Sequence, residues 1–472
     1  MMRKPLLALA LAAALAGCAV NQPATPQFDL PTPTAGDAQN AALERWWLAF
    51  DDAALTALET EALANNLDLK ATLAAIQIAR SQVLLARSDL YPSVNLAGNV
   101  SRQRISGVGS TPLPPGTPLT SNDFRLGLEM TYELDLWGKY RSSTLAAQNE
   151  LAASRYYREV VRMTVAADVA STYFRLRAAD AELALLQDTL ATRKDSLKLQ
   201  RDRFEGGVIG EYDLRQAEAE VSSVISNIAR AQQSISLFES ALAVLTGRSP
   251  REVFAAVVMR GSPILPATTV PTLPAGLSSG LLERRPDIKR SEALLAASDL
   301  RITQARADYF PSLSLTGSFG SESAALADLF TSPASIWRLG LGLVQPLIGI
   351  KKVDAAVDAA TGRRDQAAIA YQQTVQGAFR DVHDALATNR SSREVLAAES
   401  ARRDQLAQAL EVAKLRYEAG RTSYLEVLDA QRTLLGADTQ RIAAARDARL
   451  SIVDFAKALG GGWSPDAFAA AQ

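Results

Sequence analysis

Four short segments of the chain alternate apolar and polar residues at every second position. They cover residues 93–104, 123–135, about 312–320 and about 336–346. In one of them, Phe124, Leu126, Leu128, Met130, Tyr132 and Leu134 alternate with Arg125, Gly127, Glu129, Thr131, Glu133 and Asp135. A period of two places all apolar side chains on one face of a strand. The pattern is typical of membrane β-barrels, and also of soluble sheets that pack one face on a core.

Two much longer segments repeat apolar residues every seven positions, as antiparallel coiled-coil hairpins do. We expect these hairpins at 137–247 and 350–460. In the first, Leu214, Val221, Ile228, Ile235 and Leu242 alternate with Ala217, Val224, Ala231, Phe238 and Leu245. The preceding helix, about Trp137 to Phe204, makes a rod of roughly 100 Å. A rod of that length must pair with neighbours along its whole length.

The second hairpin has a poorer apolar register than the first. Asn389 and Arg403 stand where the first hairpin has Leu176 and Leu190. We expect these two polar residues to face water or another subunit.

The hairpins and strands belong to a tandem repeat. Residues 87–98 match residues 306–317, and Arg203-Phe-Glu-Gly-Gly207 matches Arg416-Tyr-Glu-Ala-Gly420. Each half has the order helix, two strands, very long helix, turn, long helix. The fold class is therefore mainly α with a small β part.

The repeat sets the expected boundaries. The first repeat covers 43–260 and the second covers 278–463. A Pro-rich linker, 261–277, joins them, and 464–472 is a C-terminal tail.

The N-terminus has the features of a lipoprotein export signal. Residues 1–17 combine a basic start with a short apolar run, and Leu15-Ala16-Gly17-Cys18 resembles the bacterial lipobox. We expect cleavage before Cys18, a diacylglycerol and an N-acyl group on that residue, and a lipid-anchored extension over 18–42. Ala19 after the cysteine favours sorting to the outer membrane.

Composition narrows the function classes. Lys plus Arg number 50 and Asp plus Glu number 51, so there is no basic excess to hold nucleic acid. The single Cys and single His make an internal disulfide impossible and favour no metal site. His383 has no nucleophile partner in any pattern we find, so we expect neither a catalytic residue nor a cofactor, and no enzyme.

Four strands cannot close a barrel, because closure takes about eight or more. An open sheet in lipid would leave its edges unpaired. A membrane barrel must therefore be built from the strands of several chains. Two, three or four copies all satisfy the strand count. Arg125, Glu129 and Arg338 are then expected to face the lumen.

The chain resembles the TolC-like outer membrane efflux proteins, in the OprM-type (NodT) lipoprotein branch. The motifs that carry the resemblance are Leu134-Asp-Leu-Trp-Gly-Lys139, Arg284-Arg-Pro-Asp-Ile288, Arg416-Tyr-Glu-Ala-Gly420, Tyr424-Leu-Glu-Val-Leu-Asp-Ala-Gln431 and Ala458-Leu-Gly-Gly-Gly-Trp463. The resemblance implies a homotrimer with a 12-stranded β-barrel in the outer membrane and an α-helical barrel in the periplasm. It also implies a periplasmic adaptor and an inner-membrane pump, often of the resistance-nodulation-division type.

The resemblance also places a gate at the hairpin turns. The residues that match its gate and latch are Leu425, Glu426, Asp429, Tyr417, Arg421 and Asp213. The latch arginine aligns with Thr422, and Arg421 lies beside it, so the latch residue stays open between them. Gly206, Gly207 and Gly420 are expected to contact the adaptor. Glu426 and Asp429 also have an ordinary explanation, as acids that stabilise a helix N-terminus.

Two other functions remain compatible with parts of the pattern. The same architecture serves type I protein secretion, and a periplasmic adaptor lipoprotein is also built on coiled-coil hairpins. The four duplicated strands favour the channel over the adaptor. Small-solute efflux is our leading prediction, because OprM-type lipoproteins usually serve such pumps.

Overall fold

In the computed structural model, the described residues are 44–109, 114, 116, 118–255, 258–261, 263–264 and 285–462. The signal peptide, Cys18, the lipid-anchored extension, nearly all of the Pro-rich linker and the C-terminal tail lie outside them. The described residues divide into a strand-containing unit, within 76–154 and 291–371, and a helical unit, within 44–75, 155–290 and 372–462.

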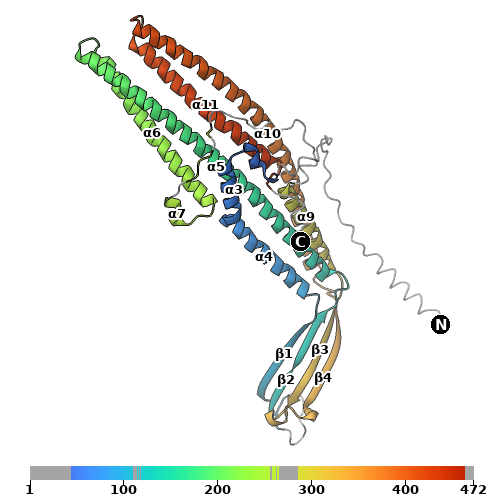
Figure 1. The fold of residues 1–472 in the computed structure, drawn as a ribbon. Coiled ribbons are helices and arrows are strands. Elements are labelled where there is room, and N and C mark those ends of the chain that lie inside the picture. The colour runs from blue at the N-terminus through green and yellow to red at the C-terminus, as the bar shows by residue number, and fades with distance from the viewer. Residues whose placement is uncertain are drawn as a thin grey trace, which may run out of the picture. The chain divides into compact units, whose positions relative to one another are not determined.

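The strand-containing unit holds one antiparallel sheet in the order β1-β2-β3-β4 (Figure 1). The strands are β1 (Ser93–Arg104), β2 (Thr120–Glu133), β3 (Ser312–Ser323) and β4 (Ser335–Val344). β2 begins three residues before the expected position, and β3 continues three residues beyond it. β4 ends before the expected residue 346, which is a proline and has no amide hydrogen to donate.

Residues at the junction between the sheet and the neighbouring helices make aromatic and ionic contacts with one another. Trp137 stacks on Phe310 with ring centroids 4.7 Å apart, and its indole nitrogen donates to the Pro311 carbonyl at 2.8 Å. Lys139, the first residue of α5 (Lys139–Glu205), forms an ion pair with Asp308 at 2.8 Å. These contacts fix the point where β2 ends and α5 begins. The short 3-10 turns η3 (Leu326–Asp328) and η4 (Ser332–Ala334) lie between β3 and β4.

Both expected hairpins are present. The first consists of α5 and α6 (Glu211–Leu245), and the second of α10 (Lys351–Glu418) and α11 (Tyr424–Ala458). The shorter elements, in chain order, are η2 (Trp46–Phe50), α3 (Ala53–Asn65), α4 (Leu67–Ser88), α7 (Pro250–Phe254) and α9 (Pro286–Ala307). The predicted fold class, mainly helical with a small duplicated strand part, is confirmed.

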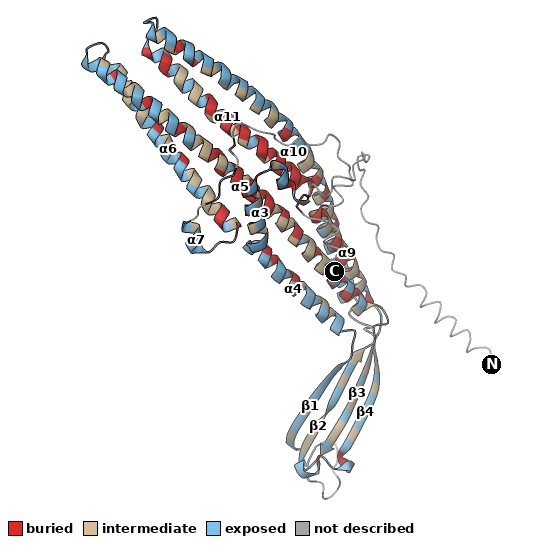
Figure 2. Ribbon diagram, in the orientation of Figure 1, coloured by how far each residue is buried: buried red, intermediate tan, exposed pale blue. Residues whose placement is uncertain are grey.

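The core lies in the helical unit, where buried residues gather along the helices, whereas the strands are mostly exposed (Figure 2). Its main cluster joins η2, α3, α5, α6 and α11 around the fully buried side chains Leu55, Val169, Tyr173, Leu176 and Leu242. Along the α5–α6 seam, Val224 and Ala231 are buried, as the seven-residue repeat predicts, and they pack with Leu186 of α5, which lies outside that repeat. None of the helices in the described part of the chain combines the length and apolar composition needed to cross a bilayer.

The expectation for Asn389 is wrong, whereas Arg403, whose side chain is 33% exposed, still reaches water. Asn389 is buried and donates from its side chain to the Ser451 hydroxyl of α11 at 2.8 Å. Arg403 pairs with Asp438 of α11 at 2.9 Å. Both therefore point toward the partner helix of their own hairpin. The seam of the second hairpin tolerates polar residues because α11 supplies matching polar partners.

Candidate functional site: the sheet faces and the hairpin tips

The strand register gathers the apolar residues on one face of the sheet. Residues directly opposite each other on neighbouring strands project from the same face. Leu96, Leu128, Phe319 and Trp337 form one such row across all four strands. Their side chains are exposed, with Trp337 at 77% and Leu96 at 71%. The sheet therefore presents an uncovered apolar face, which a soluble sheet would bury.

The opposite face is polar. Asn95, Glu129, Ser318 and Arg338 form a second row across the four strands. Arg125 belongs to the same face, opposite Asn99 of β1 and Glu322 of β3. The three residues expected in the lumen thus share one face, and charges of both signs line it.

A pair of glycines brings β2 and β3 close together on the polar face. Gly127 lies opposite Gly320. A Cβ added at Gly320 would come within 2.5 Å of the Gly127 Cα and closer still to the Leu126 carbonyl oxygen. The two backbones can approach this closely only because neither residue has a side chain. A cavity of about 230 Å³ lies over this pair and is lined by residues that include Arg125 and Glu129.

The sheet has two open edges. β1 and β4 each pair with one neighbour only among the described residues. Unpaired strand edges offer a row of backbone donors and acceptors to another chain. The geometry therefore suits assembly with further copies of the strand unit.

The turns of the two hairpins have the same backbone conformation. Gly207 and Gly420 have φ of +72° and +67°, a left-handed conformation that favours glycine. In each turn the next amide reaches back to the helix: Val208 N donates to Arg203 O at 2.8 Å, and Arg421 N donates to Arg416 O at 2.8 Å. The residues of the first turn and of its hydrogen bond therefore match those of the second turn at the repeat offset.

Tyr417 joins the two hairpins near their tips. Its hydroxyl accepts hydrogen bonds from Arg203 of α5 and, at 3.3 Å, from the Gln200 amide. The Arg203 guanidinium also lies over the Tyr417 ring, 5.1 Å from its centroid. Tyr417 packs beside the buried Tyr424. Within one chain, the contact of this tyrosine is with Arg203 and not with Asp213.

The acidic residues at the second turn differ in their surroundings. Glu426 pairs with Arg416 at 3.2 Å and accepts a hydrogen bond from Thr422. Asp429 is exposed and makes no side-chain hydrogen bond or ion pair among the described residues. It lies beyond the first turn of α11, in which Glu426 is the only acid, so the explanation as a helix N-terminus acid is wrong for Asp429. Arg421 is likewise exposed and unpaired in the described part of the chain. Leu425 is 50% exposed, and Asp213 is half-buried on α6.

A second polar contact between the hairpins lies further from the turns. The nearly fully buried Arg193 of α5 donates to Gln431 of α11 and lies 3.6 Å from Glu220 of α6. Glu220 also accepts from Arg432 of α11 at 2.7 Å. Burial lowers the pKa of the Arg193 guanidinium. The sequence analysis did not predict this cluster. The one related signal was the repeat itself, which places arginines at the matching positions 203 and 416 beside the two turns.

In the described ranges, no three His, Cys, Asp or Glu side chains lie close enough to hold a metal ion. His383 is 82% exposed and contacts Asp384 at 3.1 Å.

Comparisons with known proteins cover nearly the whole chain. The family model described as "Outer membrane efflux protein" matches residues 58–248 and 277–461. The outer membrane protein OprJ of Pseudomonas aeruginosa is 34% identical over 98% of this chain and 97% of its own length. The cation efflux system protein CusC of Escherichia coli O157:H7 is 33% identical over 97% and 98%. The crystal structure of the CmeC outer membrane channel of Campylobacter jejuni superposes with a TM-score of 0.85 at 29% identity, covering 93% of this chain and 95% of that one.

Proposed function

This chain belongs to the outer membrane efflux protein family, and from that membership we propose that it forms a passive duct for drugs or other small solutes, with no catalytic role. It is the outer-membrane component of a tripartite efflux system. The observation that carries the proposal is the uncovered apolar face of a sheet with two open edges. Such a face is stable against lipid and unstable in water.

Three copies complete the channel. Each copy supplies four strands, so a trimer makes a ring of 12 strands with the apolar row of Trp337 outside. Arg125, Glu129 and Arg338 then face a water-filled lumen. Support for three rather than two or four copies comes from the resemblance of the whole chain to trimeric channels.

The hairpin tips are proposed to meet a periplasmic adaptor, which links the duct to an inner-membrane pump of the resistance-nodulation-division type. The first turn carries exposed apolar side chains, Val208 at 73% and Tyr212 at 68%. Apolar side chains at an exposed tip favour a protein partner. The glycines Gly206, Gly207 and Gly420 allow the close approach of another backbone.

The N-terminus is proposed to anchor the protein through lipid on Cys18. Replacement of this cysteine by serine should abolish incorporation of labelled palmitate while the trimer still assembles. Small-solute export is preferred to protein secretion because a relative of nearly equal length is named as a cation efflux protein. The adaptor alternative is set aside, because the family model is that of the efflux channel itself.

Disulfide cross-linking between strand edges tests the assembly. Cys18 is the only native cysteine. A Cys18→Ser chain then receives one cysteine in β1 and one in β4, scanned along both strands in separate variants. A closed ring predicts that oxidation of the right pair produces cross-linked species that end at three chains. A matched scan with both cysteines in β2, an interior strand, should give none. Products that stop at two or four chains, or no product at any register, would contradict the trimer.

A conductance measurement tests the duct. The purified protein should form ion-conducting pores in planar bilayers, and the cross-linked ring should conduct as well. A protein that stays monomeric after removal of its lipid and never conducts would overturn the proposed function.

A further inference from the structure

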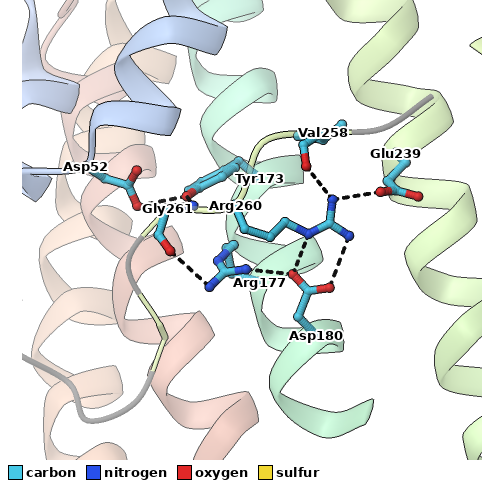
Figure 3. Close-up of polar contacts among 8 residues, drawn as sticks. All are labelled: Asp52, Tyr173, Arg177, Asp180, Glu239, Val258, Arg260 and Gly261. Atoms are coloured by element: carbon cyan, nitrogen blue, oxygen red, sulfur yellow. Dashed lines mark hydrogen bonds and ion pairs between the residues drawn. The ribbon is translucent and has the colours of Figure 1, made fainter. Parts of the chain in front are cut away.

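One arginine joins the two helices of the first hairpin far from its turn (Figure 3). Arg260 donates from Nε and Nη2 to both carboxylate oxygens of Asp180 on α5, at 3.0 and 3.2 Å. Its third nitrogen, Nη1, donates to Glu239 on α6 at 2.7 Å. A single guanidinium therefore bridges acids from both helices, with the bidentate geometry that makes such pairs strong.

The backbone on either side of Arg260 is also held. The Val258 carbonyl accepts from Arg260 Nη1 at 2.6 Å, and the Gly261 carbonyl accepts from Arg177 at 3.2 Å. The Gly261 amide donates to the hydroxyl of the fully buried Tyr173 at 3.0 Å. Arg260 thus projects from an anchored segment, so little side-chain or backbone freedom remains to be lost in forming its ion pairs.

The anchor continues into the N-terminal part of the helical unit. The Tyr173 hydroxyl donates to Asp52 at 2.8 Å, and the same carboxylate caps α3 by accepting from the Ala54 and Leu55 amides. A Cβ at position 261 would lie 2.5 Å from the Tyr173 hydroxyl oxygen and closer still to the Asp52 carboxylate. Only glycine leaves room for this approach.

The second hairpin lacks the same arrangement. At the repeat offset of 213 that relates Arg203 to Arg416, Arg393 takes the place of Asp180 and Ile452 takes the place of Glu239. Leu386 stands where the first hairpin has Tyr173. The two acids and the tyrosine that receive residues 258–261 are therefore specific to the first repeat.

We propose that residues 258–261 form a clamp that holds α5 and α6 together at the level of Asp180 and Glu239. Separation of these two helices is thereby confined to the part of the hairpin between the two acids and the Gly206–Gly207 turn. Arg260 is the positioning residue of the clamp. The assignment is independent of what the protein transports.

Distance measurements between spin labels test the clamp in the full-length protein in detergent. In a Cys18→Ser chain, one label pair is placed at Ala184 and Ser236, near the clamp, and a second pair at Lys198 and Ser222, nearer the turn; all four positions are exposed. With Arg260 present, the pair near the clamp should give a narrow distance distribution and the pair near the turn a broader one. Arg260→Ala should widen the first distribution on the order of twofold, to resemble the second.

Three further variants make the result decisive. Arg260→Lys, which reaches one acid at a time, should restore part of the narrow distribution. Arg248→Ala is the matched control, since it removes a bidentate pair with Glu61 in the same unit and leaves the clamp intact. Glu239→Gln weakens only the α6 side and serves if Arg260→Ala does not fold. An unchanged distribution at Ala184 and Ser236 in Arg260→Ala or Glu239→Gln would overturn the proposal, whether or not the protein conducts ions.

Discussion

At the scale of single residues, the helical unit contains a buried carboxylate, that of Glu59, that lowers the stability of the folded protein. Glu59 of α3 is fully buried, and neither of its oxygens has a hydrogen-bond partner in the part of the chain that the structure describes. Burial raises the pKa of the Glu59 carboxyl well above its usual range. The folded protein therefore keeps a proton that the unfolded chain releases near the ordinary pKa of about 4.3. It follows that this residue makes the free energy of unfolding fall as the pH rises above that value.

Glu59→Met should stabilise the protein, because it replaces an unpaired polar group by an apolar one of similar size. We expect a gain of about 1–3 kcal/mol in the free energy of unfolding, measured by urea titration of the helical circular dichroism signal. The gain should be larger near pH 8 than near pH 4. Glu394→Met, at an exposed site on α10, is the control and should change stability by less than about 0.5 kcal/mol. Destabilisation by Glu59→Met would show that the carboxylate has a partner in the assembled protein.

Tyr417→Phe should loosen the contact between the hairpins near their tips. The change removes the hydroxyl that accepts from Arg203 and Gln200 and keeps the ring. Loss of these hydrogen bonds should cost about 1 kcal/mol and speed amide hydrogen exchange at both tips roughly fivefold. Tyr424→Phe is the matched control, because the Tyr424 hydroxyl makes no hydrogen bond among the described residues. Equal exchange rates in wild type and Tyr417→Phe would mean that Tyr417 does not hold the hairpins together.

At the scale of elements, periodicity alone predicts most of the fold. A period of two located all four strands, and a period of seven located both hairpins, because each follows from where successive side chains point along one element. The pairing between elements is harder. Asn389 broke the apolar period and was expected at the surface, yet Ser451 on another helix satisfies it.

The same limit applies to the candidate site. The gate residues are predicted by resemblance and the lumen residues by alternation. The partners of Tyr417 and Arg193 come from different helices and leave no local pattern. The contacts of Arg260 were missed for the same reason. Its segment belongs to no helix or strand, and its partners lie 80 and 21 residues away in the chain.

Gly320→Ala should weaken the pairing of β2 with β3. The new methyl group would overlap the Leu126 carbonyl and the Gly127 backbone, so the strands must move apart. We expect a cost of about 1–3 kcal/mol, seen as a lower temperature at which the proposed trimer dissociates on a detergent gel. Gly98→Ala is the control, because its methyl group meets only the Leu126 side chain at an ordinary 3.5 Å. If both variants dissociate at the wild-type temperature, the close approach of the strands is not needed for stability.

At the scale of the whole molecule, two features of the single chain both indicate assembly in a membrane. Among the described residues, nothing covers the apolar sheet face, and the outer edges of β1 and β4 have no neighbouring strand. These are the surfaces that lipid and further copies of the chain would occupy, and a closed ring is the arrangement that leaves no edge in the membrane. Assembly also repeats every charge near the symmetry axis once per copy. A single exposed acid therefore affects the passage of ions more in the assembly than in one chain.

Asp429 is the acid on which this multiplication should act most. Three copies near one axis would place three carboxylates in a narrow water-filled throat, where their mutual repulsion is poorly screened and cations are favoured. Asp429→Ala should therefore lower the ratio of cation to anion permeability in planar bilayers, on the order of a few-fold. Glu394→Ala is the control, since it removes one exposed acid from α10 at a position far from the second turn. If Asp429→Ala leaves the permeability ratio at the value of the wild type, the acid lies away from the path of the ions.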